Sequence, residues 1–359
     1  MKALITAGGH GTRLRPLTFT SNKHLIPVAN KPMIFYSLEA VRGAGITDIG
    51  MIVNETRPVI EELLGNGKKF GVHITYIDQD EPRGLGHCLM IAERFLGKDP
   101  FVFYLGDNVL AGGIDGFVSE FKKTKPNCQL LLAKVPDPER FGVAVLNKKG
   151  EVIRTVEKPK HPETPFAITG VYLLDHHCFE AFRGKDAIKI SARGEFEIPD
   201  VFQYLLDHGY KVRAHNVTGW WKDTGKMEDL LAANRLVLER QTDGEIKGSV
   251  DKISKLAGIV RIGKGTKIVN SELRGPVVIG ENVEVRDSYI GPFTSLYNGC
   301  VIHNSEIEHS VVLGNVTIRD VERRIDNSLI GQDVTIVQNH RHPKTYSFMV
   351  GDNAKVHLV

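Results

Sequence analysis

Residues 4–15 read L-I-T-A-G-G-H-G-T-R-L-R, and they decide the fold of the first half of the chain. The run opens with apolar residues that are typical of a buried strand, and this strand leads into a loop of glycines. Glycine backbone can approach a ligand closely, and its N–H groups can surround phosphate oxygens. A guanidinium group matches the geometry of phosphate, so the arginines after the glycines support the same interpretation. The stretch predicts a phosphate-binding loop at the end of the first strand.

The spacing of this loop excludes the two commonest nucleotide loops. No Gly-Lys-Ser/Thr follows the glycines, as a Walker loop requires. A Rossmann fingerprint would place its third glycine where Leu14 stands. The loop therefore belongs to another class of nucleotide site.

Composition sets the broad class of the protein. A chain of 359 residues with 42% hydrophobic content is long enough for two domains with real cores. A net charge of +3 predicts no dedicated nucleic-acid surface. The four cysteines are scattered, which favours reduced thiols over a disulfide frame or a zinc site. With no signal segment and no apolar run of about 18 residues, we expect a soluble, cytoplasmic protein without a membrane partner.

Strands and helices alternate up to about residue 240. Continuous apolar strands between helices predict an α/β fold, a Rossmann-like mixed and mostly parallel sheet covered on both faces. Ligands of such sheets collect at the carboxyl ends of the strands. We expect strands at 48–53, 72–76, 101–105 and 129–135, and helices at 34–44, 58–64, 86–96 and 114–124.

The pattern changes after residue 245. Short apolar residues recur about every six positions, with some steps of five, and this period predicts a left-handed parallel β-helix rather than an irregular β-sandwich. A helix at 227–239 precedes the change. We therefore expect a catalytic domain at 1–240 and a β-helix domain at 246–359, whose tail from Gln338 onward leaves the repeat.

Two aspartates are candidate metal ligands. Asp107 follows the most apolar strand, and Asp223 lies in the run W-W-K-D-T-G. Carboxylates suit a hard cation such as Mg²⁺, which can bridge phosphates. An aspartate after a strand also forms Asx turns, so Asp107 alone leaves both interpretations open.

Four cations fit one task. Arg13, Lys23, Lys158 and Arg193 each stand in a stretch rich in glycine, proline or small residues. Any one of them could be a solvated surface charge. Together with the two aspartates, they are suited to holding two phosphate-bearing substrates.

One further amide could read a base, and no covalent chemistry is indicated. Gln79 stands close to Gly84 and could pair with a base edge beside exposed backbone. The histidines show no metal-ligand spacing. No Ser-His-Asp or Cys-His arrangement suggests a covalent intermediate.

The first 240 residues resemble the sugar-phosphate nucleotidyltransferases. The matching stretches occur in family order: GGHGTRLRPLT, NKHLIPVANKPMIFYSLEA, YIDQDEPRGLGH, YLGDN, FGVAV, EKP, ITGVYL, SARGEFEIPD and WWKDTG. Within the family, the chain is most similar to the long form of the glucose-1-phosphate thymidylyltransferase group, which adds a C-terminal β-helix. This resemblance implies transfer of a thymidylyl group from dTTP to glucose 1-phosphate, with Mg²⁺ as cofactor, pyrophosphate as second product and a role in deoxysugar biosynthesis.

The resemblance also implies roles for individual residues. Arg13 and Lys23 are the catalytic cations, and Asp107 and Asp223 hold the metal. The nucleotide binds at Leu4, Gly8, Gly9, Gly11, Thr12, Gln79, Pro82, Gly84 and Asp107. The sugar phosphate binds at Asn108, Gly142, Glu157, Lys158, Gly170, Val171 and Arg193.

Some alternatives stay open at this point. The thymidylyl members of the family usually have Gly-Leu-Ala-Gln where residues 84–87 read Gly-Leu-Gly-His, which also resembles uridylyltransferases, so a UTP-dependent uridylyltransferase is an alternative. The β-helix could be an acyltransferase that uses His303 or His309, or it could serve assembly or regulation. Because solenoid coils bury little surface alone, we expect a homo-oligomer.

Overall fold

The computed structural model describes residues 1–9, 11–19, 22–339 and 346–358. Its contacts divide the chain into two units, Met1–Gly9 with Ile34–Asp223 and His10–Met33 with Thr224–Val359. This division follows contacts, and the domain boundary expected at 240–246 from the sequence pattern stays a prediction. Of the expected tail, residues 340–345 and 359 lie outside the described residues. In the described parts of the chain, no helix has the length and apolarity needed to cross a membrane.

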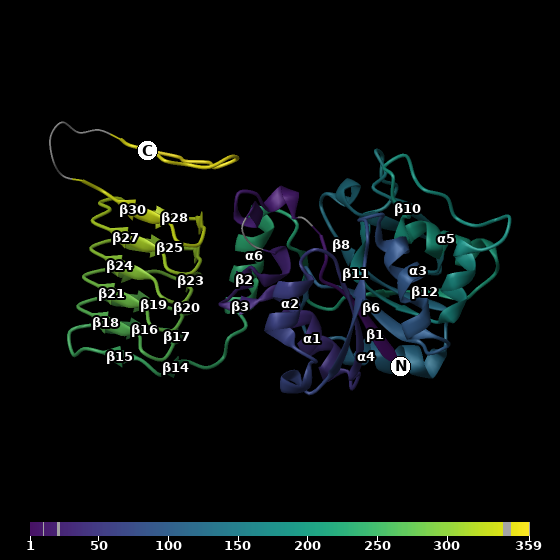
Figure 1. Ribbon diagram of the computed structural model, residues 1–359, viewed down its shortest axis with the longest axis horizontal. Coiled ribbons are helices and arrows are strands. Elements are labelled where there is room, and N and C mark those ends of the chain that lie inside the picture. The colour runs from purple at the N-terminus through teal and green to yellow at the C-terminus, as the bar shows by residue number, and fades with distance from the viewer. Residues whose placement is uncertain (10, 20–21, 340–345, 359) are drawn as a thin grey trace. The chain divides into compact units, whose positions relative to one another are not determined.

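The first unit is built around a nine-stranded mixed sheet (Figure 1). Its order is β10-β9-β11-β6-β1-β4-β5, and β8 joins β11 to β12. The run β6-β1-β4-β5 is parallel, whereas β11 is antiparallel to its neighbours. This sheet confirms the predicted α/β class. The strands are β1 (Lys2–Thr6), β4 (Asp48–Val53), β5 (His73–Asp78), β6 (Phe101–Leu105), β8 (Cys128–Lys134), β9 (Gly142–Leu146), β10 (Val152–Glu157), β11 (Phe166–Leu174) and β12 (Val212–Asn216).

Helices cover both faces of this sheet, with α1 and α2 on one side and α3 and α5 on the other (Figure 1). On the second side, Phe103 of β6 packs in one core with Leu89 of α3 and Phe202 of α5, and all three side chains are fully buried. The elements predicted between residues 34 and 135 are all present, with ends that shift by at most two residues. The helices are α1 (Met33–Gly43), α2 (Arg57–Leu64), η4 (Lys68–Phe70), α3 (Leu85–Leu96), α4 (Asp115–Thr124), η5 (Pro138–Arg140), η6 (His176–Phe182) and α5 (Ile198–Asp207); a separate ribbon pairs β7 (Asn108–Leu110) with β13 (Trp221–Asp223).

Most of the second unit is a coil of short parallel strands in three sheets, the arrangement of the predicted left-handed β-helix (Figure 1). Ile262, Ile279 and Leu296 pair in register and stack in its buried core. Equivalent positions lie 17 residues apart, as between Ser271 and Ser288. Three full hexads would need about 18 residues per coil, which explains the shortened steps in the sequence.

The strands of this coil form three sets. The first sheet holds β14 (Glu245–Ile246), β17 (Val260–Ile262), β20 (Val277–Ile279), β23 (Thr294–Leu296), β26 (Val311–Val312) and β29 (Leu329–Ile330). The second holds β15 (Ser249–Val250), β18 (Lys267–Val269), β21 (Glu284–Arg286), β24 (Val301–His303), β27 (Thr317–Arg319) and β30 (Thr335–Val337). The third holds β16 (Lys255–Ala257), β19 (Glu272–Arg274), β22 (Tyr289–Ile290), β25 (Glu306–Glu308) and β28 (Ile325–Asp326).

The second unit also contains the segment that follows the glycine loop. Its main anchor is Asn234 of α6 (Met227–Leu238), whose side chain is 1% exposed. Asn234 Oδ1 accepts hydrogen bonds from Ala29 N at 2.8 Å and Ser295 Oγ at 2.7 Å, and its Nδ2 donates to Phe293 O at 3.0 Å. Asn30 Nδ2 donates to Leu296 O at 2.6 Å. These bonds join the N-terminal segment to the β-helix. The segment comprises η1 (Thr12–Leu14), η2 (Leu17–Phe19), η3 (Lys23–Leu25), β2 (Pro27–Val28) and β3 (Lys31–Pro32).

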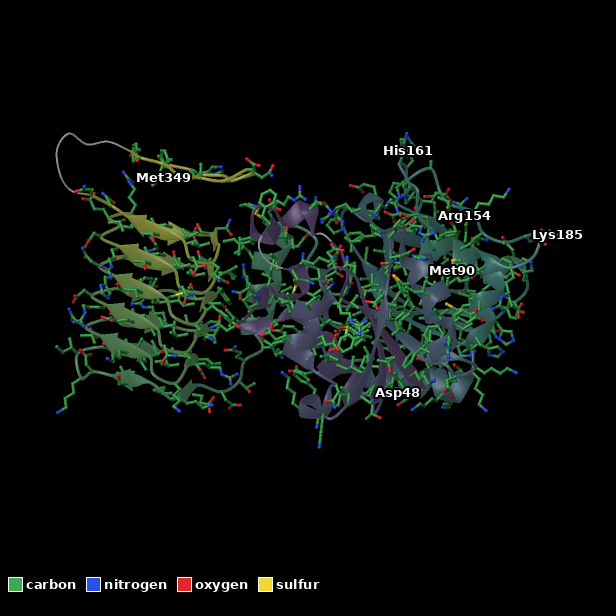
Figure 2. The ribbon with its side chains drawn as sticks, in the orientation of Figure 1. Asp48, Met90, Arg154, His161, Lys185 and Met349 are labelled. Atoms are coloured by element: carbon green, nitrogen blue, oxygen red, sulfur yellow. The ribbon has the colours of Figure 1, made fainter. Side chains whose placement is uncertain are left out.

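The described part of the tail, residues 346–358, contains no helix or strand. It exposes large apolar side chains, among them Phe348 and Met349, and Met349 is fully exposed (Figure 2). The expectation that the tail leaves the repeat from Gln338 onward stays a prediction.

Candidate active site

The glycine loop leaves the sheet at the carboxyl end of β1. Ala7 N donates to Ile52 O at 2.7 Å, which continues the strand pairing for one residue beyond β1. Gly9 then has φ 124°, a backbone conformation that favours glycine over residues with a side chain. Leu4 lies within β1 and its side chain is fully buried, so it can contribute to a site only through the strand that it helps to form.

In the second unit, Gly11 and Lys23 lie against one another. Gly11 has φ 55°, and a Cβ built on it would lie 3.1 Å from Lys23 Cβ and 2.9 Å from Thr18 Cγ2. Thr18 Oγ1 donates to Gly11 O at 2.7 Å. Thr12 and Arg13 follow in η1 and are exposed to solvent. The structure thus brings together the sequence-predicted Gly11 and Lys23, and it leaves Arg13 exposed to solvent.

Lys23 is held in place by its own short helix. Asn22 caps η3, because its Oδ1 accepts a hydrogen bond from His24 N at 2.8 Å. His24 is 1% exposed, and its Nδ1 lies 2.9 Å from the same oxygen. The buried histidine therefore fixes the turn that carries the half-buried Lys23.

The candidate base-reading segment follows β5. Gln79 N donates to Val53 O at 2.7 Å, and Gly84 has φ 90°. A Cβ built on Gly84 would lie 2.7 Å from Phe196 O, so a side chain would not fit there. Gly86 N donates to the same carbonyl at 2.8 Å. The exposed Pro82 lies in this loop, which is thereby attached to the segment that carries Arg193.

The two candidate metal ligands are brought together by the ribbon of β7 and β13. Asp223 is the direct cross-strand partner of Asn108, the residue next to Asp107. Burial, followed by the negative charges of Glu157, Asp107 and Asp223, raises the pKa of Tyr172 well above its ordinary value. The charges of all three carboxylates therefore act on one buried hydroxyl. Two aspartates on paired strands are a donor set that suits a hard divalent cation.

Asn108 organises the centre of this group. Its side chain is 2% exposed; its Oδ1 accepts from Trp221 Nε1 at 2.6 Å and from Gly170 N at 3.1 Å, and its Nδ2 donates to Asp107 Oδ1 at 2.9 Å. A Cβ on Gly170 would lie 2.5 Å from Asn108 Cγ. Val171 comes next in β11 and is fully buried. The backbone at Gly170 must stay bare for this arrangement to form.

The candidate sugar-phosphate cations share one carboxylate. Glu157 Oε1 lies 3.0 Å from Lys158 Nζ and 3.1 Å from a terminal nitrogen of Arg193. A Cβ built on Gly142 would lie 3.1 Å from Glu157 Oε2. Lys158 has φ 38°, which a non-glycine residue rarely adopts. The structure thus brings Gly142, Glu157, Lys158 and Arg193 together.

Arg193 is also held by Glu197. The carboxylate of Glu197 is 2.6 Å from Arg193, and it also accepts from Ser191 Oγ at 2.7 Å. Burial alone would raise the pKa of Glu197, but the hydrogen bonds from Arg193 and Ser191 outweigh burial and lower it. The hydrogen bond to Glu197 is also the main reason that the pKa of Arg193 is raised. Arg193 is therefore a fixed cation at this end of the sheet.

Sequence reasoning missed several residues that shape the site. Trp221, Tyr172 and Glu197 lie in the stretches WWKDTG, ITGVYL and SARGEFEIPD, from which only neighbouring residues were chosen. The only sequence signal for these three residues was that each lies in a stretch that also contains a predicted site residue. Their partners lie far away in the chain, so no local pattern could identify them.

Two clusters of histidine and carboxylate lie apart from these residues. Among the described residues they are Asp175 with His176 and His177, and Glu308 with His309 and Asp326. Asp175 caps η6 by accepting from His177 N, which gives that cluster a structural role. His303 and His309 are each paired with a carboxylate, at 3.1 Å and 2.9 Å.

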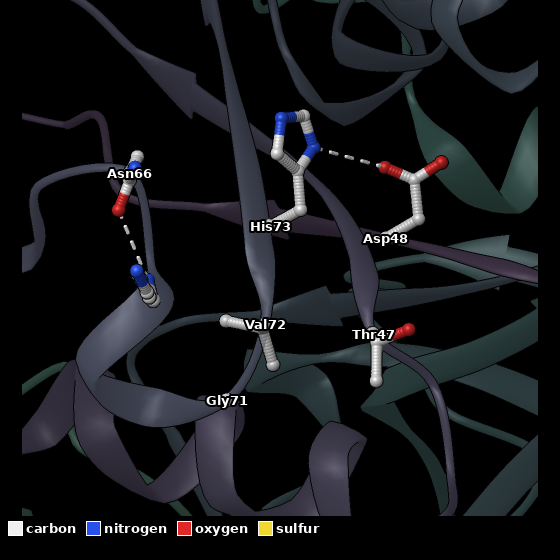
Figure 3. A pocket seen from close by; sticks show the side chains of 7 residues that line it. Thr47, Asp48, Asn66, Gly71, Val72 and His73 are labelled. Atoms are coloured by element: carbon white, nitrogen blue, oxygen red, sulfur yellow. Dashed lines mark hydrogen bonds and ion pairs between the residues drawn. The ribbon is translucent and has the colours of Figure 1, made fainter.

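A hollow of about 690 Å³ lies at the amino ends of β4 and β5, the edge opposite to the candidate site. It is lined by Asp48, His73, Val72, Asn66 and neighbouring residues (Figure 3). His73 Nδ1 pairs with Asp48 at 3.5 Å. None of the predicted site residues lines it, so volume alone does not identify the site.

Comparison with known proteins places the chain among enzymes. Residues 2–240 match the family model of the nucleotidyl transferases. The chain is 46% identical to glucose-1-phosphate thymidylyltransferases from Streptomyces antibioticus and Streptomyces griseus, over 100% of this chain and 99% of each relative. A solved structure described as a glucose-1-phosphate thymidylyltransferase from Bacillus anthracis, in complex with sucrose, has 39% identity and a TM-score of 0.63, covering 68% of this chain and 98% of that one.

Proposed function

The chain belongs to the nucleotidyl transferase family, within its glucose-1-phosphate thymidylyltransferase group, and on that premise we propose how its residues perform the reaction. The reaction joins dTTP and α-D-glucose 1-phosphate into dTDP-glucose and pyrophosphate. The observation that carries this assignment is 46% identity over the whole chain to relatives of that name. The same chemistry serves deoxysugar nucleotide biosynthesis.

The chemical step is an in-line displacement at phosphorus. An oxygen of the sugar phosphate forms a bond to the α-phosphorus, and the bond from that phosphorus to the bridging oxygen of the β-phosphate breaks. Pyrophosphate leaves with the electron pair. The sugar phosphate is already an anion at neutral pH, so no general base is needed. The protein must position the two substrates and offset the repulsion between their charges.

Arg13 and Lys23 supply the positive charge. Arg13 neutralises the β- and γ-phosphates and the departing pyrophosphate, and Lys23 holds the α-phosphate with the attacking phosphate. Arg13 follows Gly9 by four residues, so chain length keeps the two within about 14 Å of one another. The bare backbone of Gly8, Gly9 and Gly11, with the Thr12 hydroxyl, surrounds the triphosphate.

Asp107 and Asp223 would hold Mg²⁺, a proposal supported by their approach across the β7–β13 ribbon. When bound, the ion offsets negative charge on the nucleotide phosphates. Asn108 keeps Asp107 oriented through its 2.9 Å hydrogen bond to the carboxylate.

The sugar phosphate occupies the other group of residues. Lys158 and Arg193 hold its phosphate in competition with Glu157, which both cations contact in the structure. The hexose hydroxyls contact Asn108, Glu157 and the backbone at Gly142, Gly170 and Val171.

The base contacts Gln79, Pro82 and Gly84. Thymine differs from uracil by one methyl group, which a fitted pocket distinguishes by about 1–3 kcal/mol. We therefore expect partial use of UTP. A UTP-dependent uridylyltransferase stays the alternative function.

For the β-helix we propose a role in assembly rather than acyl transfer. A coil of short strands buries little surface by itself, which favours a homo-oligomer. His303 and His309 each pair with a carboxylate of the neighbouring coil, Glu284 and Asp326, and such coil-to-coil ion pairs are an ordinary feature of a repeat surface. The site residues are suited to small phosphate-bearing substrates, and we place the enzyme in the cytoplasm.

The test is a substrate grid scored by pyrophosphate release. dTTP, UTP and ATP are each paired with the 1-phosphates of glucose, galactose and glucosamine, with and without Mg²⁺. Preference for dTTP with glucose 1-phosphate supports the proposal, whereas preference for ATP or for another sugar contradicts it. Acetyl-CoA with an amino-sugar phosphate tests the β-helix.

Lys23→Ala tests the mechanism. Loss of one preorganised cation should lower kcat about 10²–10³-fold, and the fold should survive. The control is Lys185→Ala, which removes the same charge from an exposed position (Figure 2). If both variants keep the activity of the parent, Lys23 has no catalytic role.

A further inference from the structure

The amide of Gln79 is held by two groups behind it. Its Nε2 lies 3.2 Å from His87 Nδ1 and 3.5 Å from Gly84 O. Gln79 is the first residue after β5, and His87 stands in the first turn of α3, where it is 6% exposed. A half-buried amide is thus fixed by a buried imidazole and a backbone carbonyl.

Two neighbours together set which way the amide points. Gly84 O can only accept hydrogen bonds, and at 3.5 Å from Gln79 Nε2 it favours an inward NH₂ group only weakly by itself. His87 Nδ1 faces the same NH₂ group and must therefore be an acceptor, which is the neutral imidazole with its proton on Nε2. Both N–H bonds of the amide point inward, and Oε1 is left to face a ligand.

The surroundings keep His87 neutral. Burial, followed by the positive charge of Arg83, lowers the pKa of His87 below its ordinary value of 6.5, against the opposing charges of Asp80 and Glu81. Asp80 Oδ1 lies 3.7 Å from His87 Nε2, the nitrogen that carries the proton. At neutral pH the acceptor form is therefore the main form.

We propose that His87 is a positioning residue that turns Gln79 Oε1 toward the nucleobase, and that it selects bases carrying an N3–H group. This inference rests on the proposed function, in which Gln79 contacts the pyrimidine. Thymine and uracil both present N3–H as a donor, whereas cytosine presents a bare N3 acceptor at the same place. An acceptor facing an acceptor leaves both groups without a hydrogen bond, and such mismatches discriminate strongly.

Protonation of His87 removes the support for this orientation. Nδ1 then becomes a donor, so an inward NH₂ group opposes Nδ1–H and an inward oxygen opposes Gly84 O, and in neither case is Oε1 held firmly toward the base. Because the pKa of His87 is lowered from the ordinary value of 6.5, the selectivity for thymine over cytosine should hold at neutral pH and fall only as the pH drops through the lowered pKa. The ratio of kcat/KM for dTTP to that for dCTP isolates this effect, because the two nucleotides carry the same triphosphate.

Two variants of His87 test the proposal in the full-length enzyme. His87→Phe keeps an aromatic ring but removes the acceptor, and we expect the dTTP/dCTP ratio to fall about tenfold or more. His87→Gln offers an acceptor that does not titrate, so it should keep the ratio and lose its pH dependence. The dTTP/dUTP ratio is the internal control and should change in neither variant, because both bases carry N3–H.

The outcomes separate this inference from the proposed function. If the parent enzyme releases no pyrophosphate from dTTP, the proposed function fails. If the parent is active but its dTTP/dCTP ratio is the same at all pH values and in His87→Phe, only the role of His87 fails. Should His87→Phe not fold, the pH profile of the parent beside that of His87→Gln decides the matter. A pH-dependent ratio that His87→Gln retains would reflect the nucleotides and overturn the inference.

Discussion

Replacing Asn234 with alanine should loosen the segment that carries Lys23. The side chain is 1% exposed, and it makes three hydrogen bonds, to Ala29 N, Ser295 Oγ and Phe293 O. Each bond contributes about 0.5–1.5 kcal/mol, and a buried partner left without one costs about 1–3 kcal/mol. We therefore expect Asn234→Ala to lower the free energy of unfolding by about 3–5 kcal/mol.

The assay is urea denaturation together with steady-state kinetics. We expect kcat to fall about tenfold, since a loosened segment holds Lys23 less firmly near its reacting geometry. Ser295→Ala is the graded control, because it removes one of the three hydrogen bonds and should cost about 1 kcal/mol. If the free energy of unfolding of Asn234→Ala lies within about 0.5 kcal/mol of the parent value, which is the scatter of a neutral substitution, and kcat is unchanged, Asn234 does not hold the segment.

Three further perturbations follow from the first unit. Gly170→Ala should cost about 1–3 kcal/mol in thermal denaturation and reduce sugar-phosphate affinity, because its Cβ would lie 2.5 Å from Asn108 Cγ; unchanged stability would contradict this contact. Glu197→Gln should destabilise the protein by roughly 1–3 kcal/mol at pH 7. Because the pKa of Glu197 is lowered from 4.5, its carboxylate stabilises the folded protein fully above pH 4.5, and this stabilisation is lost as the pH falls through the lowered pKa. The difference in free energy of unfolding between variant and parent should therefore narrow over that range. A difference that stays constant with pH in urea titrations would refute the pairing with Arg193. Chelation by EDTA should abolish pyrophosphate release and added Mg²⁺ should restore it, whereas Asp223→Asn should need a higher Mg²⁺ concentration for half-maximal rate; equal requirements would remove Asp223 from the metal site.

The strands and helices of the first unit could be predicted because their signals are local. Residues 101–105 are apolar throughout and lie in the middle of the sheet, and the strand at 48–53 was predicted with the bounds that it has. The β-helix was also readable, since its period repeats along the sequence. Its 17-residue coil appears in the sequence as shortened steps.

The assembly of the site could not be predicted from these local patterns. Asp107 and Asp223 come together only because β7 and β13 pair, and nothing near either residue specifies that partner. The orientation of Gln79 depends on His87, which appeared in the sequence only as a departure from the family pattern. The family resemblance predicted which residues form the site, whereas the contacts between those residues became known only from the structure.

The attachment of residues 22–33 to the β-helix was equally unpredictable. Asn30 and Leu296 are 266 residues apart, and the hydrogen bond between them leaves no trace in either local sequence. The interaction is specific to this tertiary structure, so it could not be inferred from period or composition.

That long separation has a consequence for biosynthesis. A ribosome adds about 5–20 residues per second, so Asn30 waits on the order of 10–50 s before Leu296 is made. During that interval the β-helix strand that binds this segment has not been synthesised, so the segment is available to a chaperone or to a neighbouring polypeptide. Slow codons between the two would lengthen the wait, which makes the yield of active enzyme depend on the pace of translation as well as on the finished sequence.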